Sequence, residues 1–432
     1  MDKTCILGYI VYNLYGILAL IKGGSTMQKK KLGLPAWIFI AMVAGILVGL
    51  CFLKSPDLTT QYIKPIGTIF INLLKFIVVP IVLLSLICGM ISMKDIKKVG
   101  SIGWKTLVYY MVTTLIAIVI GLVVANIFKG SFPLLDTTGA QYTASSSNFM
   151  DTIVNIFPSN LWAPLVNATM LQVIVIALFI GVGILLVGEK AAPTVALVES
   201  LNEVFMKIMM IIINCSPIGV FCLMVNVVAV NGPSIVGSLA IVLGVAYLGY
   251  ILHMAIVYSV AVKSLAGMSP VSFFKSMVPA IIFAFTSTSS VATLPLTKEC
   301  SDKMGANPEY SSFILPLGAT INMDGTAIYM GVATIFIATC YGVTLTLSQM
   351  LAVVLTATLA SIGTAGVSGA GMIMLAMVLE AVGLPVEGIA LIYGVDKIFD
   401  MGRTTLNIVG DASCAVVVSK IEEKRAGKTA AA

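Results

Sequence analysis

Charged residues are scarce in this chain. Of its 432 residues only 10% are Asp, Glu, Lys or Arg, whereas 59% are apolar, and the mean hydropathy is +1.06. This balance lies far outside the range of soluble globular domains. Water therefore cannot be the main solvent of the protein.

Histidine and paired cysteines are also lacking. The sole histidine, His253, lies in an apolar stretch, where a packed core histidine is expected rather than a proton relay. The eight cysteines are scattered without a CxxC pair or metal-ligand spacing, which is typical of small apolar packing residues. No disulfide framework is implied.

What the chain has in abundance is long apolar runs. Crossing about 30 Å of hydrocarbon takes roughly 20 helical residues. Six runs of about this length precede residue 263: Trp37–Phe52, Ile66–Ser92, Trp104–Phe128, Met170–Val187, Val204–Val230 and Ile235–Val262. We expect a multi-pass protein of the plasma membrane, in contact with lipid.

The positive charges are placed unevenly around these spans. The loops that share a side with the N-terminus carry basic residues at 29–31, 94–105, 263, 298–303 and 420–428, and the opposite loops hold only Lys54, Lys64 and Lys129. Cytoplasmic loops carry the excess of Lys and Arg, so both termini are predicted to be cytoplasmic. The net charge of +6 thus reflects membrane orientation, and no nucleic-acid partner is expected.

Residues 1–30 are expected to form an N-terminal extension and cytoplasmic start. The apolar run Cys5–Ile21 has the length of a signal peptide or an extra span, yet no clear small-residue cleavage site follows it. Met27 with the three lysines after Gln28 resembles a natural start, so an upstream extension without function is an equally open interpretation.

After Lys263 the apolar segments are broken by small and polar residues. FTSTSSVATLP (Phe285–Pro295) precedes LGATINMDGT, and SIGTAGVSGAG (Ser361–Gly371) precedes DKIFDMGRTTLNIVGD. Broken helices at corresponding places in two repeats are typical of a transporter with a midplane site. We predict two re-entrant helical hairpins; the alternative is that small residues merely let helices pack closely.

One membrane helix carries a narrow polar stripe. Asp396, Asp400, Arg403, Asn407 and Asp411 are spaced by four, three, four and four residues. They fall within roughly 80° of arc and extend about 22 Å along a helix. Each charge at the bilayer centre costs about 2.5–3.5 kcal/mol, so the stripe must face the protein interior. For Asp396 a purely structural ion pair is an equally open interpretation.

The carboxylates of this region outnumber Arg403, the basic residue that we count with them. Asp324 joins the three carboxylates of the stripe, which gives about −3 against Arg403 alone. Such a surplus calls for cations, and sodium takes oxygen ligands such as those of Asn322 and Asn407. A guanidinium suits a carboxylate held in two hydrogen bonds, and Asp400 can hold an ammonium. The pattern favours an acidic amino acid as substrate.

NMDGT together with DMGRTTLN resembles the glutamate transporter family, the dicarboxylate/amino acid:cation symporters, over about residues 30–420. The resemblance implies an all-α membrane protein with eight transmembrane helices, two re-entrant hairpins and inverted repeats, working as an elevator-type homotrimer. It implies the following division: residues 31–265 mainly scaffold and trimerisation helices, with the third helix (about 104–128) and as a further candidate the sixth (235–262) joining the transport domain; 266–420 the transport core of hairpin 1, helix 7, hairpin 2 and helix 8; and 421–432 a cytoplasmic tail.

The resemblance also implies roles for single residues. Arg403 would bind the side-chain carboxylate and Asp400 the amino group of the substrate. The rest of the substrate pocket would comprise Thr326, Thr404, Asn407, Thr288, Ser290, Val367 and Gly371. Sodium would be carried at about two to three sites, without an organic cofactor: one with Asp411, Asn322, Asn407 and Gly318; one with Thr320, Ser361, Ile362 and Thr364; and a deeper one with Tyr110, Thr113, Thr114, Asn322 and Asp324. A further arginine usual in the family is absent, since Thr288 and Met401 occupy its two places.

We therefore expect a sodium-coupled symporter that imports glutamate or aspartate, and no enzyme. Proton coupling, a C4-dicarboxylate substrate and a neutral amino acid stay open as alternatives. Arg403 argues against neutral substrates, and Asp400 against substrates that lack an amine. An intramembrane aspartyl protease is disfavoured, because its two carboxylates share a proton and the chain reads IVGDAS rather than GxGD. A passive channel is disfavoured by the two predicted hairpins.

Overall fold

The computed structural model describes residues 34–134, 154, 157–232, 234–361 and 370–430. Within these residues the regular secondary structure is entirely helical, with no strand. The predicted all-α class is thereby confirmed.

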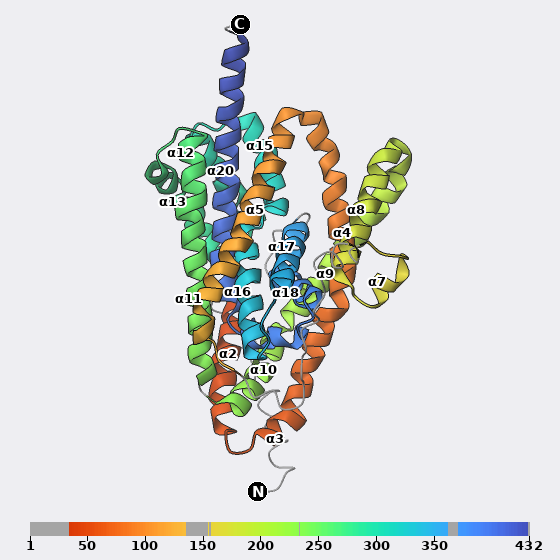
Figure 1. The fold of residues 1–432 in the computed structure, drawn as a ribbon, viewed down its shortest axis with the longest axis vertical. Coiled ribbons are helices and arrows are strands. Elements are labelled where there is room, and N and C mark those ends of the chain that lie inside the picture. The colour runs from red at the N-terminus through yellow and green to blue at the C-terminus, as the bar shows by residue number, and fades with distance from the viewer. Residues whose placement is uncertain (1–33, 135–153, 155–156, 233, 362–369, 431–432) are drawn as a thin grey trace, which may run out of the picture.

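The part of the chain before residue 265 forms long apolar helices (Figure 1). They are α2 (Leu34–Cys51), α4 (Lys64–Val99), α5 (Ser101–Phe128), α8 (Met170–Val187), α9 (Ala192–Asn214), α10 (Ser216–Asn231) and α11 (Ser234–His253). Short elements connect or extend them: α3 (Pro56–Leu58), the π-helical turns Thr59–Ile63 and Met254–Tyr258, the 3-10 turns Lys129–Ser131 and Gly188–Ala191, α7 (Trp162–Val166) and α12 (Ser259–Ser264).

The rest of the chain contains shorter helices and one long terminal helix. They are α13 (Pro270–Ser287), α14 (Ser290–Lys303), α15 (Pro308–Ile321), α16 (Asp324–Cys340), α17 (Leu347–Ser361), α18 (Ala370–Ala381), the 3-10 turn Val386–Gly388, α19 (Ile389–Tyr393) and α20 (Asp396–Ala430).

Several helical stretches are long and apolar enough to cross a membrane. Among the described residues there are six: Pro56–Ile91, Ser101–Ser131, Gln172–Asn214, Gly237–Ser264, Pro270–Ser287 and Pro308–Cys340. Four shorter apolar helices accompany them: Ala36–Cys51, Ser216–Val230, Leu347–Ser361 and Gly371–Ala381. The predicted number of eight transmembrane helices stays a prediction.

One predicted span has a different course. Val204–Val230 was expected to be a single helix, but α9 ends at Asn214 and α10 begins at Ser216, so this expectation was wrong. Pro217 stands in the first turn of α10, where its missing N–H leaves a carbonyl of the preceding turn without its helical donor.

Two pairs of packed helices lie where the two hairpins are predicted, and their re-entrant course in a membrane stays a prediction. In hairpin 1, α13 and α14 pack against each other, and α13 ends where Thr288 adopts a left-handed conformation with φ 53°. Ser289 then caps α14 by accepting a hydrogen bond from the Ala292 N–H at 3.2 Å. In hairpin 2, α17 packs against α18, and its tip, residues 362–369, lies outside the described residues.

Helices α16 and α20 occupy the centre of the bundle. Helix α20 contacts α5, α11, α13, α14, α15 and α16, and its C-terminal end projects beyond the other helices (Figure 1). Nearly every residue of α16 is buried, whereas the outer helices expose large apolar side chains such as Phe76, Trp104 and Phe179. Exposed apolar surface on this scale fits contact with lipid. The polar groups at the start of α16 and in the stripe Asp396–Asp411 of α20 are therefore held inside the protein.

Candidate functional site

The polar stripe of α20 faces the interior. Asp396 is 8% exposed, Arg403 2% and Asp411 2%, and Asp400 and Asn407 are likewise buried. This is the placement that the cost of a charge in hydrocarbon predicts. The stripe continues into α15, α16 and the hairpins, so the candidate site is assembled from the part of the chain after residue 266 together with α5 and α11.

Arg403 is held by two acids of its own helix. Its Nε donates to Asp400 Oδ1 at 2.8 Å, and Nη1 and Nη2 donate to the two oxygens of Asp396 at 3.1 and 3.3 Å. The guanidinium lies over the Tyr329 ring, 4.8 Å from its centroid. Gly371 of α18 allows a close approach, because a Cβ there would lie 2.3 Å from Nη1. Hairpin 2 thus packs directly on the arginine.

Lys397 is a functional candidate that the sequence reasoning missed. Its Nζ donates to Thr288 Oγ1 at the tip of hairpin 1 and lies 3.4 Å from Asp400 Oδ2. The predicted charge of −3 left this residue out and was wrong. Four carboxylates stand against two cations, Arg403 and Lys397, which gives −2 if all are ionised. The signal was available, since Lys397 lies directly between Asp396 and the rest of the stripe.

The break between α15 and α16 brings three polar side chains together. Asn322 leaves the helical conformation with φ −82° and ψ 100°. Its Nδ2 donates to Asp411 Oδ1 at 2.9 Å and to the Asn407 carbonyl at 3.0 Å. Asn407 Oδ1 accepts from the Gly325 N–H at 2.7 Å.

The same break leaves oxygens available for a cation. Asn322 Oδ1 is buried and has no hydrogen-bond partner among the described residues. Gly318 lies against Asp411, because a Cβ there would meet Asp411 Oδ1 at 2.4 Å and Tyr110 Oη at 2.5 Å. A buried acceptor without a donor is costly, and a hard cation such as sodium would satisfy it. These residues therefore offer the oxygen ligands that a hard cation requires.

Asp324 forms a second polar cluster at the start of α16. Thr114 Oγ1 donates to Asp324 Oδ1 at 2.6 Å, Tyr258 Oη donates to Oδ2 at 2.7 Å, and His253 Nε2 lies 3.2 Å from Oδ2. All four side chains are fully buried. The His253 Nδ1 has no hydrogen-bond partner in the described part of the chain. The sequence reasoning assigned no role to His253 or Tyr258, although a lone histidine in an apolar span was a usable signal.

The other predicted residues are distributed around these clusters. Tyr110 Oη donates to the Ile314 carbonyl at 3.2 Å, and Thr113 Oγ1 donates to the Tyr110 carbonyl at 3.2 Å. The remaining described candidates are Thr326, Thr404 and Ser290, all buried, together with Thr320 and Ser361, whose hydroxyls donate to backbone carbonyls. Val367, Ile362 and Thr364 lie outside the described residues.

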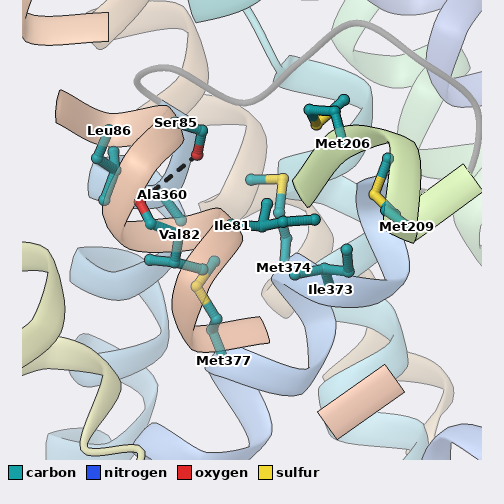
Figure 2. A pocket seen from close by; sticks show the side chains of 10 residues that line it. All are labelled: Ile81, Val82, Ser85, Leu86, Met206, Met209, Ala360, Ile373, Met374 and Met377. Carbon is teal, nitrogen blue, oxygen red and sulfur yellow. Dashed lines mark hydrogen bonds between the residues drawn. The ribbon is translucent and has the colours of Figure 1, made fainter. Parts of the chain in front are cut away.

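A separate apolar cavity lies beside hairpin 2 (Figure 2). Its lining comes from α4, α9, α17 and α18: Ile81, Val82, Ser85, Leu86, Met206, Met209, Ala360, Ile373, Met374 and Met377. Ser85 brings the one hydroxyl, and no charged side chain reaches the cavity. It cannot hold an ionised substrate. Among the described residues, no three His, Cys, Asp or Glu side chains cluster as metal ligands.

Comparison with known proteins bears on the origin of this arrangement. The family model of the sodium:dicarboxylate symporter family matches residues 34–421. The chain is 35% identical over 403 residues to the proton/sodium-glutamate symport protein of Geobacillus stearothermophilus, covering 91% of this chain and 95% of that protein. It is 35% identical over 415 residues to the proton/glutamate-aspartate symporter of Escherichia coli (strain K12), covering 92% and 95%.

A third relative is named for another substrate. The chain is 31% identical over 400 residues to the C4-dicarboxylate transport protein of Bacillus subtilis (strain 168), covering 90% of this chain and 94% of that protein. The matches extend over the long apolar helices and both halves of the polar site, and the predicted family resemblance is confirmed. The chain is an integral protein of the plasma membrane and belongs to the sodium:dicarboxylate symporter family, whose members are transporters and not enzymes.

Proposed function

We propose that this protein is a secondary active symporter that imports glutamate or aspartate together with sodium ions. The observation that carries the proposal is the buried pair of Arg403 and Asp400, one turn apart on α20. A guanidinium can hold a carboxylate in two hydrogen bonds, and a carboxylate can hold an ammonium. An acidic amino acid offers both groups, and proteins named for glutamate and aspartate symport are among the relatives.

Sodium coupling is proposed from the acids that lack a fixed cation. Asp324 and Asp411 are buried away from Arg403 and Lys397, and Asn322 Oδ1 is a buried acceptor without a partner among the described residues. Charges that are buried without a counter-ion cost several kcal/mol, so cations would have to enter with the substrate. We propose about two to three sodium ions, at the residue sets that the family resemblance implies.

Proton coupling is the second candidate, because one contact favours it. His253 Nε2 lies 3.2 Å from Asp324 Oδ2 inside the membrane bundle. A protonated imidazole there would supply the positive charge that a sodium ion would otherwise bring to Asp324. The relative from Geobacillus stearothermophilus is named for both ions.

We further propose how the chain is organised. Residues 266–420 and α5 would form the transport core and move as an elevator, with α11 as a further candidate, and the remaining helices of 31–265 would form the scaffold of a homotrimer. Both termini would be cytoplasmic, because basic residues gather in the loops that share their side. Cross-linking in native membranes and labelling of single cysteines from either side test the trimer and the orientation.

Uptake by proteoliposomes tests the function. Purified protein would be offered labelled aspartate, glutamate and serine under an imposed sodium gradient, and separately under an imposed proton gradient. We expect aspartate or glutamate to accumulate with the sodium gradient alone and serine to be excluded. Accumulation that follows only the proton gradient would favour the second candidate. Absence of acidic amino-acid uptake under either gradient would refute the proposal.

A further inference from the structure

The ammonium group of Lys397 lies beside Asp400, the carboxylate that we propose to bind the substrate's amino group. Its Nζ lies 3.4 Å from Asp400 Oδ2 and donates to Thr288 Oγ1. Only 15% of the lysine side chain and 6% of the Asp400 side chain are exposed. The lysine therefore lies within the site and links α20 to the tip of hairpin 1.

Both oxygens of Asp400 already face a cationic donor. Arg403 Nε is 2.8 Å from Oδ1, and Lys397 Nζ is at Oδ2. With Asp396 on the other side of the guanidinium, the substrate end of the site holds two carboxylates and two cations. Its fixed charge is zero. A substrate amine can reach Asp400 Oδ2 only where it displaces the lysine or shares the oxygen with it.

We infer that Lys397 is a specificity-determining residue whose tethered ammonium competes with the substrate's amine for Asp400 and takes its place when a dicarboxylate has no amine. The inference rests on the proposed function, since it assumes that Asp400 and Arg403 contact the substrate. It changes one expectation from the sequence, namely that Asp400 disfavours substrates without an amine.

The physical reason is the charge that an amine-free substrate would meet. Without Lys397, Asp400 would keep only Arg403 as a partner, which also faces Asp396 and the substrate carboxylate, so the site would repel a dianion where water is largely excluded and charges interact strongly. With Lys397 on Oδ2 that repulsion is neutralised, and the carboxylates of the substrate face Arg403 and the lysine. When an amino acid binds instead, Lys397 keeps the Thr288 hydroxyl as an acceptor.

The first measurement uses the unmodified protein. Succinate, a C4-dicarboxylate without an amine, should inhibit labelled aspartate uptake competitively, and labelled succinate should accumulate under the same ion gradient. If aspartate is transported but succinate neither inhibits that transport nor accumulates, the inference is overturned and the proposed function stands. Failure of both substrates would instead overturn the proposed function.

The second measurement uses Lys397→Met in the full-length protein. The ratio of kcat/KM for succinate to that for aspartate should fall at least about tenfold, because in this variant Asp400 Oδ2 is left without a cationic donor only when the substrate brings no amine. Lys303→Met is the matched control, since Lys303 is 71% exposed and pairs with Glu299 away from the site; its ratio should equal that of the unmodified protein.

A structural role for the lysine predicts a different result. If Lys397 only clamps hairpin 1, removal of its acceptor by Thr288→Val should reproduce the effect of Lys397→Met, and both substrates should lose equally. That outcome, or an unchanged ratio in Lys397→Met, would overturn the inference. A Lys397→Met protein that loses succinate transport selectively, while Thr288→Val changes the transport of both substrates to the same extent, supports it.

Discussion

Exchange of Arg403 for lysine separates the charge of the substrate site from its geometry. Lysine keeps a positive charge between Asp396 and Asp400, but one ammonium cannot reproduce the three contacts of Nε, Nη1 and Nη2, at 2.8 to 3.3 Å. A charge-assisted hydrogen bond contributes about 1.5–3 kcal/mol. Loss of one of the two bonds to a substrate carboxylate should therefore lower kcat/KM for aspartate by about 10- to 150-fold.

The stability of this variant should change less than that of Arg403→Ala. Alanine would leave two buried carboxylates without their guanidinium, and breaking a buried ion pair in this way costs about 3–5 kcal/mol. The melting temperature of the purified protein should therefore be highest for the unmodified protein, lower for Arg403→Lys and lowest for Arg403→Ala.

The assay is the initial rate of labelled aspartate uptake into proteoliposomes at a fixed ion gradient and equal protein density. The reasoning fails if Arg403→Lys transports aspartate with a kcat/KM within about threefold of the unmodified protein, a change smaller than one lost charge-assisted bond. It also fails if the fractional loss of uptake is no larger than the fractional loss of folded protein.

Three further substitutions test the cation and hairpin contacts. Asp324→Asn removes a buried charge that a cation would neutralise, so uptake should need more sodium for half saturation; an unchanged sodium titration would remove Asp324 from the cation site. Gly318→Ala puts a Cβ 2.4 Å from Asp411 Oδ1, and overpacking of this kind costs about 1–3 kcal/mol, so its melting temperature and uptake should fall. Gly183→Ala, with nothing within 4 Å of its Cβ, is the control and should change neither. Gly371→Ala puts a Cβ 2.3 Å from Arg403 Nη1. The end of the arginine side chain can shift to make room, so KM for aspartate should rise while the melting temperature stays close to that of the unmodified protein. A KM equal to that of the unmodified protein would contradict this contact.

Local chemistry determined a large part of this protein. The scarcity of charge required a membrane protein, because so little polar surface cannot cover a soluble fold. The spacing of four and three residues placed Asp396, Asp400, Arg403 and Asp411 on one helical face, and their burial follows from the cost of charge in lipid. The broken segment Phe285–Pro295 predicted a helix end at the tip of hairpin 1, where the structure has it, whereas the end of α15 before Asn322 was not predicted, because LGATINMDGT was interpreted as a polar helix.

Tertiary structure decided which of these groups meet. Asp324 contacts Thr114, His253 and Tyr258, which lie 66 to 210 residues away in the chain. Lys397 reaches Thr288 across 109 residues, so a lysine that could have faced a lipid headgroup or water lies beside Asp400 in the proposed substrate site. Helical periodicity fixes only the face of its own helix on which a side chain lies. The partner of that face depends on how α5, α11, hairpin 1 and α16 pack around α20, and this packing is set by the shape of the whole bundle.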